Sequence, residues 1–536
     1  MSTAMPTLAH PLIGAALAAC LARMPATAAD APSPAARDAA IPVWVYFKED
    51  RAAPASIADT ALAPRALVRR AHRRTLPGLF DLHDVPVRQG HADAVASTGA
   101  TVRTRSRWLH AVSALATPRQ REALAALPGV DRVVPVARGR VLREDERPAP
   151  AHAPEGGAAM ATDYGFARQQ LEQVSLTRLH SWGFTGTGVV IGVLDTGFNR
   201  AHQAFNNPAR PLQVVAEWDF VNGDGNTGQQ QGDDPNQHKH GTWILGTMAA
   251  YMPGTLVGGA FGASFVLAKT ENVASETPVE EDWYVAGLEF VEQHGADIAT
   301  SSLGYIDWHT QADLDGVTTV CAIGVNVATA NGMVCVTSAG NSGHDADPAT
   351  ATLGTPADAL EVITCAAHDV NGNVASFSSS GPTADGRLKP EVGACGVSTA
   401  TVHSTFTNAV SYVSGTSLST PLVAAAAACI MQARPEYGVA QMREALFATA
   451  SRSDAGGLHP DPLFVQGHGI INAFKAATRG RAQADLNLDG RVNGADLGTL
   501  LGSWGQSGDP AALPADLDAN GTVDGSDLGR LLGDWG

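Results

Sequence analysis

The feature that most constrains this chain is an alternation of short apolar runs with helical segments between about residues 163 and 478. Short runs that are rich in β-branched residues are typical of buried strands. The runs lie at 189–194, 266–268, 298–300, 333–336 and 362–364. Strands that alternate with helices indicate βαβ units, and helices then cover both faces of the parallel sheet. We therefore expect an α/β domain over residues 161–478.

An apolar run near the N-terminus predicts a signal peptide over residues 1–29. Residues 12–22 form its core, and the small residues at 26–29 supply a cleavage site. A lipoprotein box at 17–20 is the alternative. Because a membrane-spanning helix needs about 20 apolar residues, we expect no transmembrane segment. The protein is expected to be secreted, either free in the extracellular space or associated with the cell surface.

Residues 30–160 are predicted to form a small α+β domain that ends in a linker. β-branched and aromatic residues favour strands at 41–47 and 131–136, and alternation favours another strand at 101–108. A helix should begin after Thr117, because Thr117 and Gln120 have the spacing of a capping box. The stretch at 138–160 is rich in Pro, Gly, Ala and charged residues. We interpret it as an exposed linker that a protease can cut.

The net charge of −17 is divided unevenly along the chain. Basic residues outnumber acidic ones in the first 160 residues, and acidic residues outnumber basic ones in the rest. Opposite charges favour contact between the front of the chain and its body. An acidic body binds phosphate groups poorly, so we expect no nucleic-acid partner.

The cysteines do not have the pattern of a disulfide framework. Five remain after the signal peptide, and they are widely spaced. They are Cys321, Cys335, Cys365, Cys395 and Cys429. Because they lie in strand-like or Ala-rich helical segments, we predict buried thiols.

The tail, residues 479–536, contains a duplicated loop that predicts a paired EF-hand-like helical module. Each copy has carboxylates or amides at loop positions one, three, five and nine, Gly at six, a backbone carbonyl at seven and Asp at twelve. Oxygen ligands at this spacing bind Ca²⁺, although the usual residue at twelve is Glu. The predicted ligands are Asp485, Asn487, Asp489, Arg491, Asn493 and Asp496 in the first loop, and Asp516, Asp518, Asn520, Thr522, Asp524 and Asp527 in the second. Solvated acidic turns are the alternative.

Three short motifs carry the residues of one chemistry. Asp195 lies in Asp-Thr-Gly at the end of a predicted strand, His240 in His-Gly-Thr, and Ser417 in Gly-Thr-Ser before an Ala-rich helix. A serine hydroxyl is a weak nucleophile until an imidazole takes its proton, and that imidazole needs a carboxylate to fix its tautomer. We therefore interpret Asp195, His240 and Ser417 as catalytic residues. His238 is a competing base, but it lacks the Gly-Thr that follows His240.

These motifs resemble those of the subtilisin-like serine peptidases, the subtilases, over about residues 163–478. The resemblance implies that Asn341, in the segment 338–343, donates its side-chain amide to the oxyanion of the tetrahedral intermediate. It also implies that a peptide substrate pairs as an added strand with Ser302, Leu303 and Gly304. The expected activity is hydrolysis of polypeptides by a serine endopeptidase through an acyl-enzyme intermediate.

Two segments depart from the subtilase pattern. Ala394-Cys395-Gly396 stands where the family usually has Ala-Pro-Gly, and Leu418-Ser419 stands where Met-Ala is usual. Neither departure removes a catalytic group. The first concerns a local turn, and the second concerns packing beneath the helix of Ser417.

The domains on either side carry resemblances of their own. The front domain, with its motif at 107–113, resembles a subtilase propeptide, which implies an autoprocessed precursor inhibited by its own propeptide; an independent binding domain is the alternative. The tail resembles a dockerin, which implies a cohesin-like scaffold as partner. Subtilases often bind further calcium in loops, and the acidic loops at 222–225 and 233–234 are read as solvated, with no ligands assigned.

Other functions fit the same resemblance. One is a noncatalytic cell-surface binding protein that keeps a subtilase scaffold and uses the tail for attachment. Another is acyl transfer or peptide ligation at the same site. The intact set of Asp195, His240, Ser417 and Asn341 favours hydrolysis.

Overall fold

The structure is a computed structural model, and it describes residues 39–52, 54, 56, 60–136, 138–139, 146–149, 162–273, 279–306, 309–453, 460–508 and 513–536. The predicted signal peptide and both of its candidate cleavage sites lie outside these residues.

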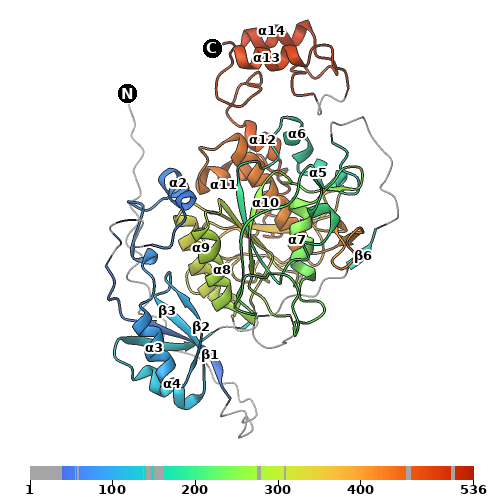
Figure 1. Cartoon of the computed structure of the whole chain (residues 1–536). Helices are drawn as coiled ribbons and strands as arrows, with labels where there is room; N and C mark the ends of the chain where they lie inside the picture. Colours follow the sequence, from blue (N-terminus) through green and yellow to red (C-terminus); the bar gives the residue numbers. More distant parts are fainter. Residues whose placement is uncertain are drawn as a thin grey trace.

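A seven-stranded parallel sheet forms the centre of the molecule (Figure 1). Its strands are β7 Val190–Asp195, β8 Gln213–Asp219, β11 Ser264–Lys269, β13 Ile298–Ser301, β14 Val334–Ser338, β15 Ile363–His368 and β16 Val392–Cys395. Their order across the sheet is β16-β15-β14-β13-β7-β11-β8, and every neighbouring pair is parallel. All five apolar runs lie in these strands, so the predicted parallel sheet is confirmed.

Helices bury both faces of this sheet. On one face Ile191 and Val193 join a core with α5 Arg168–Gln173, α6 Leu176–Ser181, α7 Lys239–Ala249, α10 Thr416–Ala433, α11 Val439–Ala448 and α12 Ala473–Thr478. On the other face Val190 and Leu194 pack with α8 Glu281–Gln293 and α9 Val320–Ala330. Alternate residues of β7 thus face opposite cores, which explains why its run is continuously apolar.

Within the described part of the chain, α10 is the one helix long and apolar enough to cross a membrane, and 94% of that window is buried inside the protein. Its composition is therefore that of a core helix. The five cysteines are buried free thiols, as predicted.

The front domain, residues 39–136, is an antiparallel sheet with helices (Figure 1). Its strands β1 Ile41–Phe47, β2 Thr101–Ser106, β3 Ala111–Ala116 and β4 Val130–Pro135 have the order β2-β3-β1-β4. Its helices are α2 Pro64–Arg73, α3 Gln89–Ser97 and α4 Pro118–Ala125. Thr117 and Gln120 form the predicted capping box at the start of α4, and the small α+β fold is confirmed.

Buried ion pairs join the front domain to the body. Glu292 of α8 is fully buried and pairs with Arg69, with Arg70 at 2.9 Å and with Arg107 at 2.9 Å. Burial alone would raise the pKa of Glu292, but the three guanidinium groups hold it below its ordinary value. The uneven charge of the sequence therefore corresponds to a real contact between these two parts.

Two parts of the predicted linker over 138–160 form short strands, and residues 140–145 and 150–160 lie outside the described residues. β5 Arg138–Gly139 pairs antiparallel with β12 Val279–Glu280. β6 Glu146–Pro148 pairs antiparallel with β18 Val410–Val413, which in turn pairs with β17 Thr399–Val402. The segment has a loop-like composition, but two exposed strand edges of the body supply the hydrogen-bond partners that hold it extended.

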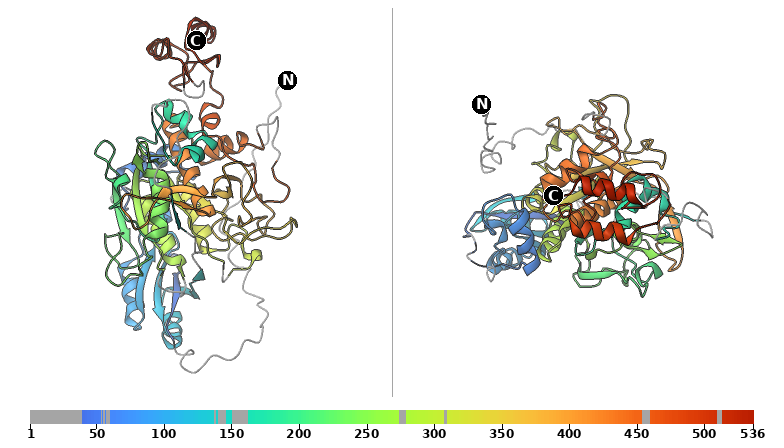
Figure 2. Two further views of the ribbon diagram at one scale, coloured as in Figure 1. Left: turned by 90° about the vertical axis from the view of Figure 1, so that its right-hand side faces the viewer. Right: turned by 90° about the horizontal axis from the view of Figure 1, so that it is seen from above.

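The tail module, residues 479–536, lies at the end of the molecule near α6 and α12 (Figure 2). It contains two copies of a loop followed by a helix, α13 Gly494–Gly502 and α14 Gly525–Gly533. Matched apolar residues of the two copies share one small core: Leu486 with Leu517, Val492 with Val523, and Leu500 with Leu531. The duplication in the sequence is thus a duplication in space.

Candidate active site

The fold brings the ends of three elements together. Asp195 ends β7, His240 lies in the first turn of α7, and Ser417 lies in the first turn of α10. His240 Nδ1 lies 2.7 Å from Asp195 Oδ1, and the Asp195 side chain is fully buried. With Nδ1–H donating to this carboxylate, Nε2 is the nitrogen able to accept a proton.

The glycines of two motifs allow this contact. A Cβ at Gly241 would lie only 2.3 Å from the carbonyl oxygen of Gly197 and 3.1 Å from Asp195 Oδ1. Gly197 has a φ of +125°, a conformation that residues with a side chain rarely adopt. Asp-Thr-Gly and His-Gly-Thr therefore contain glycine because the end of β7 and the start of α7 touch backbone to backbone.

His240, Ser417, Asn341 and the segment Ser302-Leu303-Gly304 line one cleft. Ser302 Oγ donates to the carbonyl oxygen of Ser417 at 2.9 Å, and Ser417 Oγ donates to the carbonyl oxygen of Ser302 at 3.4 Å. The structure thus brings the predicted nucleophile, base, oxyanion donor and substrate edge to the same hollow.

The carboxamide of Asn341 is held beside the nucleophile. Its Oδ1 accepts hydrogen bonds from the backbone N–H and the hydroxyl of Thr416, both at 2.9 Å. Because the oxygen is fixed by the residue before Ser417, the amide nitrogen keeps a defined direction relative to the cleft.

The competing base lies elsewhere. His238 precedes α7, and its Nε2 lies 3.2 Å from the carbonyl oxygen of Ser404. Its hydrogen bond is therefore to backbone, whereas His240 has the carboxylate of Asp195.

Ser419, in the second segment that departs from the family pattern, contacts Ala394, the residue before Cys395 of the first. Ser419 Oγ accepts a hydrogen bond from the backbone N–H of Ala394 at 2.8 Å and donates to the carbonyl oxygen of Ala366 at 2.6 Å. One hydroxyl of α10 thus bonds to β15 and β16 together. The sequence alone did not indicate that the two segments touch.

Sequence reasoning missed two parts of the site's surroundings. The first is β12, a strand edge of the body with which β5 pairs. The second is the environment of Glu146, whose carboxylate accepts hydrogen bonds from Trp243 Nε1 at 2.9 Å, Ser404 N at 2.8 Å and Ser411 Oγ at 2.9 Å. The Trp243 ring in turn contacts the ring of His240, with centroids 6.2 Å apart. No motif marks either feature, because each depends on chain pairing across the fold.

The loops of the tail gather carboxylates, and the ion pair among their predicted ligands that the described residues contain is a long one, 3.9 Å between Arg481 Nε and Asp485 Oδ2. Asp516, Asp518 and Asp527 have carboxylate oxygens within 4.8 Å of one another. In the first loop Asp485 Oδ1 is buried and has no hydrogen-bond partner among the described residues, and burial raises the pKa of Asp485. Convergent oxygens and a buried orphan oxygen are what a hard cation such as Ca²⁺ requires.

The other predicted ligands are divided between the loops and the helix ends. Asp496 and Asp527, at position twelve, are buried and accept backbone hydrogen bonds from Leu486 at 2.8 Å and Leu517 at 2.7 Å. Asn493 and Asp524, at position nine, cap α13 and α14. Asn487, Asp489, Asp518 and Asn520 bond to backbone N–H groups within their loops, and Arg491 and Thr522 follow them at the backbone-carbonyl position.

The acidic loop of the body is different. Lys269 Nζ is fully buried and lies 2.8 Å from both Asp219 Oδ2 and Asp233 Oδ2. A lysine of the protein itself therefore supplies the countercharge at this place.

Comparison with known proteins identifies the fold and the chemistry. Residues 186–469 match the subtilase family, and residues 42–149 match the peptidase S8 propeptide domain of Bacteroidota. The chain belongs to the subtilase family. This subtilase is 32% identical to subtilisin DY of Bacillus licheniformis, over 57% of its own length and 96% of that protein. It is 30% identical to subtilisin E of Bacillus subtilis (strain 168), over 60% and 72% of the two lengths.

The fold also matches a solved structure. Fervidolysin from Fervidobacterium pennivorans, a keratinolytic enzyme related to subtilisin, superposes with a TM-score of 0.53 at 20% identity, covering 82% of this chain and 61% of the fervidolysin chain. The family matches and the similarity to subtilisin DY show that the protein is a subtilisin-like serine endopeptidase with a propeptide, and that the front domain is this propeptide.

Proposed function

We propose that this subtilase is a secreted endopeptidase that hydrolyses peptide bonds with Asp195, His240 and Ser417 and is made as a precursor that cuts itself. The observation that carries the proposal is the 2.7 Å contact between His240 Nδ1 and Asp195 Oδ1 in a cleft that also contains Ser417 and Asn341. The secreted state rests on the signal-like sequence at 1–29.

The proposed reaction follows from these positions. Ser417 Oγ attacks the peptide carbonyl carbon and its proton passes to His240 Nε2, while Asp195 stabilises the imidazolium. Asn341 and the Ser417 backbone N–H donate to the oxyanion of the tetrahedral intermediate. Breaking the C–N bond returns the proton to the leaving amine, and water then hydrolyses the acyl-enzyme by the same route.

The segment that follows the propeptide supports the proposal that a peptide substrate runs across the cleft by pairing with strand edges. β5 pairs with β12 ahead of the site, and β6 pairs with β18, which ends at Val413, four residues before Ser417. Both pairings are antiparallel, as for a peptide added to a strand edge. We infer that the processing cut falls after Gly139 and before Glu146, and that the propeptide inhibits the enzyme until it leaves.

The test compares the intact masses and N-terminal sequences of the purified wild type and Ser417→Ala. We expect the wild type to lose the propeptide and begin between residues 140 and 146, while the variant keeps everything after the signal peptide. If both proteins keep the propeptide, or both lose it equally, self-processing by Ser417 is wrong. A serine-directed phosphonate that labels only the wild type would separate hydrolysis from the noncatalytic binding alternative, and product analysis would reveal any ligation.

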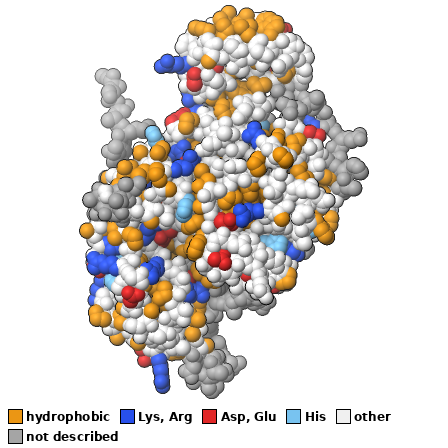
Figure 3. Space-filling model, in the orientation of Figure 1, with side chains coloured by type: hydrophobic (Ala, Val, Ile, Leu, Met, Phe, Trp, Pro, Cys, Tyr) orange, Lys and Arg blue, Asp and Glu red, His pale blue; other side chains and the backbone are white. Residues whose placement is uncertain are grey.

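For the tail module we propose an EF-hand-like pair of Ca²⁺ sites and a dockerin-like role in attachment. Four large apolar side chains of the helices are about half exposed: Leu501, Trp504, Leu532 and Trp535. Hydrophobic atoms gather on this module in Figure 3. Exposed apolar residues in matched pairs favour a protein partner, such as a cohesin-like scaffold domain. The proposal is wrong if the double variant with Trp504→Ala and Trp535→Ala binds cohesin-like domains as tightly as the wild type does.

A further inference from the structure

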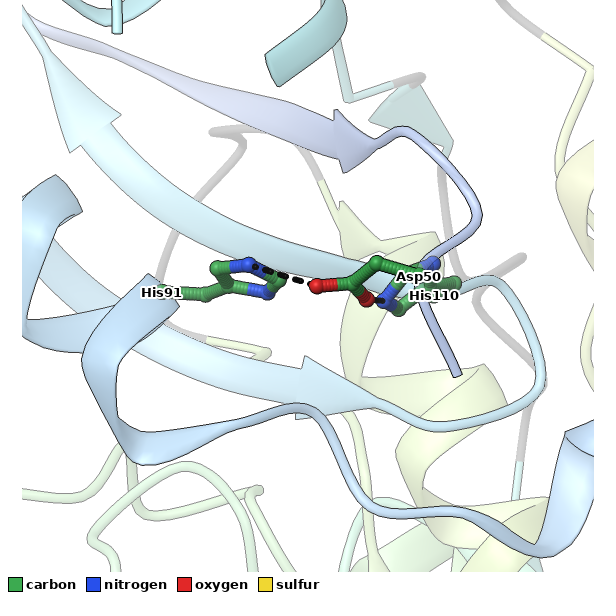
Figure 4. Close-up of side chains that lie close together, drawn as sticks. All are labelled: Asp50, His91 and His110. Carbon is green, nitrogen blue, oxygen red and sulfur yellow. Dashed lines mark ion pairs between the residues drawn. The ribbon is translucent and has the colours of Figure 1, made fainter. Parts of the chain in front are cut away.

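Three metal-ligand side chains of the propeptide meet far from the catalytic cleft (Figure 4). Asp50 follows β1, His91 lies on α3, and His110 lies in the turn between β2 and β3. His91 Nε2 is 3.6 Å from Asp50 Oδ2, and His110 Nε2 is 3.5 Å from Asp50 Oδ1. One ligand atom from each residue lies within 4.8 Å of the other two.

The imidazole nitrogens at this place are buried without hydrogen bonds. His110 is 4% exposed, and neither of its ring nitrogens has a hydrogen-bond partner among the described residues. Nδ1 of His91 is in the same situation. Burying an unbonded polar atom is costly, and His110 Nε2 is such an atom that faces the carboxylate of Asp50. His91 presents its other nitrogen, Nε2, to the same carboxylate, so a ligand between the two rings and Asp50 would bond to all three.

Two arginines lie beside the site, and each pairs with a carboxylate. Arg88 Nη1 lies 2.7 Å from Asp50 Oδ2, but the Arg88 side chain is 57% exposed, so a divalent cation at Asp50 would displace a solvent-accessible partner. Arg51 pairs with Glu49, whose carboxylate accepts from its Nε at 3.0 Å and lies 2.9 Å from its Nη2. Glu49 Oε2 also lies 3.8 Å from His110 Nδ1, on the side of the ring opposite Asp50.

We propose that Asp50, His91 and His110 bind Zn²⁺, with water as a fourth ligand. Two imidazoles and one carboxylate are a zinc donor set, whereas Ca²⁺ and Mg²⁺ take oxygen ligands. Glu49 is then the outer carboxylate that orients His110 through Nδ1. Asp50 is partly exposed, so the ion has a path from solvent.

The consequence is a propeptide whose stability depends on metal. The ion would join the end of β1, helix α3 and the β2–β3 turn, which are distant in sequence. Phe47 already stacks on the His91 ring, with centroids 4.1 Å apart. Because binding to the folded form stabilises it, loss of zinc should loosen the propeptide and hasten its release.

The experiment uses the full precursor kept uncut by Ser417→Ala, so it does not depend on catalysis. After chelation and gel filtration, the precursor is loaded with Zn²⁺, and bound metal is measured by mass spectrometry. We expect one zinc per chain, unaffected by excess Ca²⁺, and a visible spectrum typical of tetrahedral Co²⁺ when cobalt replaces zinc.

Substitutions locate the ion. His91→Gln and His110→Gln, each in the Ser417→Ala precursor, should lose the zinc, and Glu49→Gln should bind it about 10–100-fold more weakly. His72→Gln is the matched control, because His72 is an exposed histidine of the same domain. The proposal is overturned if the unaltered precursor binds no zinc and gives no tetrahedral cobalt spectrum, or if well-folded His91→Gln and His110→Gln still bind zinc like the control.

Discussion

The groups that surround the carboxylates differ between the propeptide interface and the tail module. On α8, Glu292 is surrounded by three arginines of the propeptide, and Glu289 and Asp297 also face arginines. In the tail, Asp516, Asp518 and Asp527 converge on one another, and the hydrogen bonds they accept come from backbone N–H groups of their own loop. The first group is neutralised by another domain, whereas the second forms no ion pair with the described residues and could hold a metal ion.

The difference separates two kinds of acidic cluster by whether a cation of the protein lies beside the carboxylates. A carboxylate that pairs with a buried guanidinium of another domain is part of an interface, and removing one partner leaves the other buried without a countercharge. Carboxylates that share a loop and lack a cation of the protein indicate a metal site. In the body, the sequence predicts that Asp233 lies in a solvated loop, but its side chain is buried and pairs with Lys269 of the same domain.

The largest effect should come from Glu292→Gln in the Ser417→Ala precursor. The substitution leaves Arg69, Arg70 and Arg107 without their shared charge, and we expect a loss of about 3–5 kcal/mol in propeptide docking. Denaturant unfolding monitored by hydrogen exchange in the propeptide measures it. Glu122→Gln, on the exposed side of α4, is the control. Equal stability of the two variants would show that the arginines do not depend on Glu292.

Removal of calcium should destabilise the tail module. At a calcium concentration of 100 times Kd, binding stabilises a folded site by about 2.7 kcal/mol, so a chelator should unfold the module first. Trp504 and Trp535 are half exposed on this module and report the change by fluorescence. A double variant, Asp516→Asn with Asp527→Asn, serves as the control, because without these two carboxylates its transition should no longer respond to the chelator. An unchanged module transition after chelation contradicts the calcium assignment.

Acid should weaken the interface by a smaller amount. The pKa of Glu292 is held below its ordinary 4.5 in the complex, so its contribution is complete above about pH 4.5 and is lost as the pH falls through the lowered value. Burial raises the pKa of Glu289, and its protonation acts in the opposite direction. We therefore expect Glu289→Gln to steepen the acid loss, as measured by release of cut propeptide on gel filtration. A shallower loss in that variant would reverse this reading.

The smallest effect should come from the rim of the interface. Arg65 pairs with Asp297, but its side chain is 42% exposed. Exposed pairs contribute little, so Arg65→Ala should cost about 0.2–1 kcal/mol in the same unfolding assay. A loss as large as that of Glu292→Gln would mean that burial does not separate the strong pairs from the weak ones.

The features predicted correctly from sequence are local in the chain. The apolar runs became β7, β11, β13, β14 and β15, and the capping box of Thr117 and Gln120 begins α4. Asp195 and His240 could be paired because an activated serine needs an imidazole and a carboxylate, and the three motifs occur in the subtilase order. Patterns of this kind are read from neighbours in the sequence.

The features that sequence could not supply depend on distant pairing. An excess of basic residues predicts attraction, but nothing in the chain says that Arg69 and Arg107 share Glu292. β12 is two residues long, and only its partner β5 marks it as an edge. The contact between Ser419 and Ala394 likewise joins residues of a helix and a strand that no pattern connects.

The two short strands β5 and β6 give the processing cut a kinetic meaning. While the chain is continuous, the propeptide is tethered to the peptidase, and its effective concentration at the arginine interface is set by the length of that tether. A cut between the strands leaves β5 with the propeptide and β6 with the enzyme. After the cut, the same ion pairs hold two separate molecules together. Dilution then shifts the binding equilibrium toward the free, active peptidase.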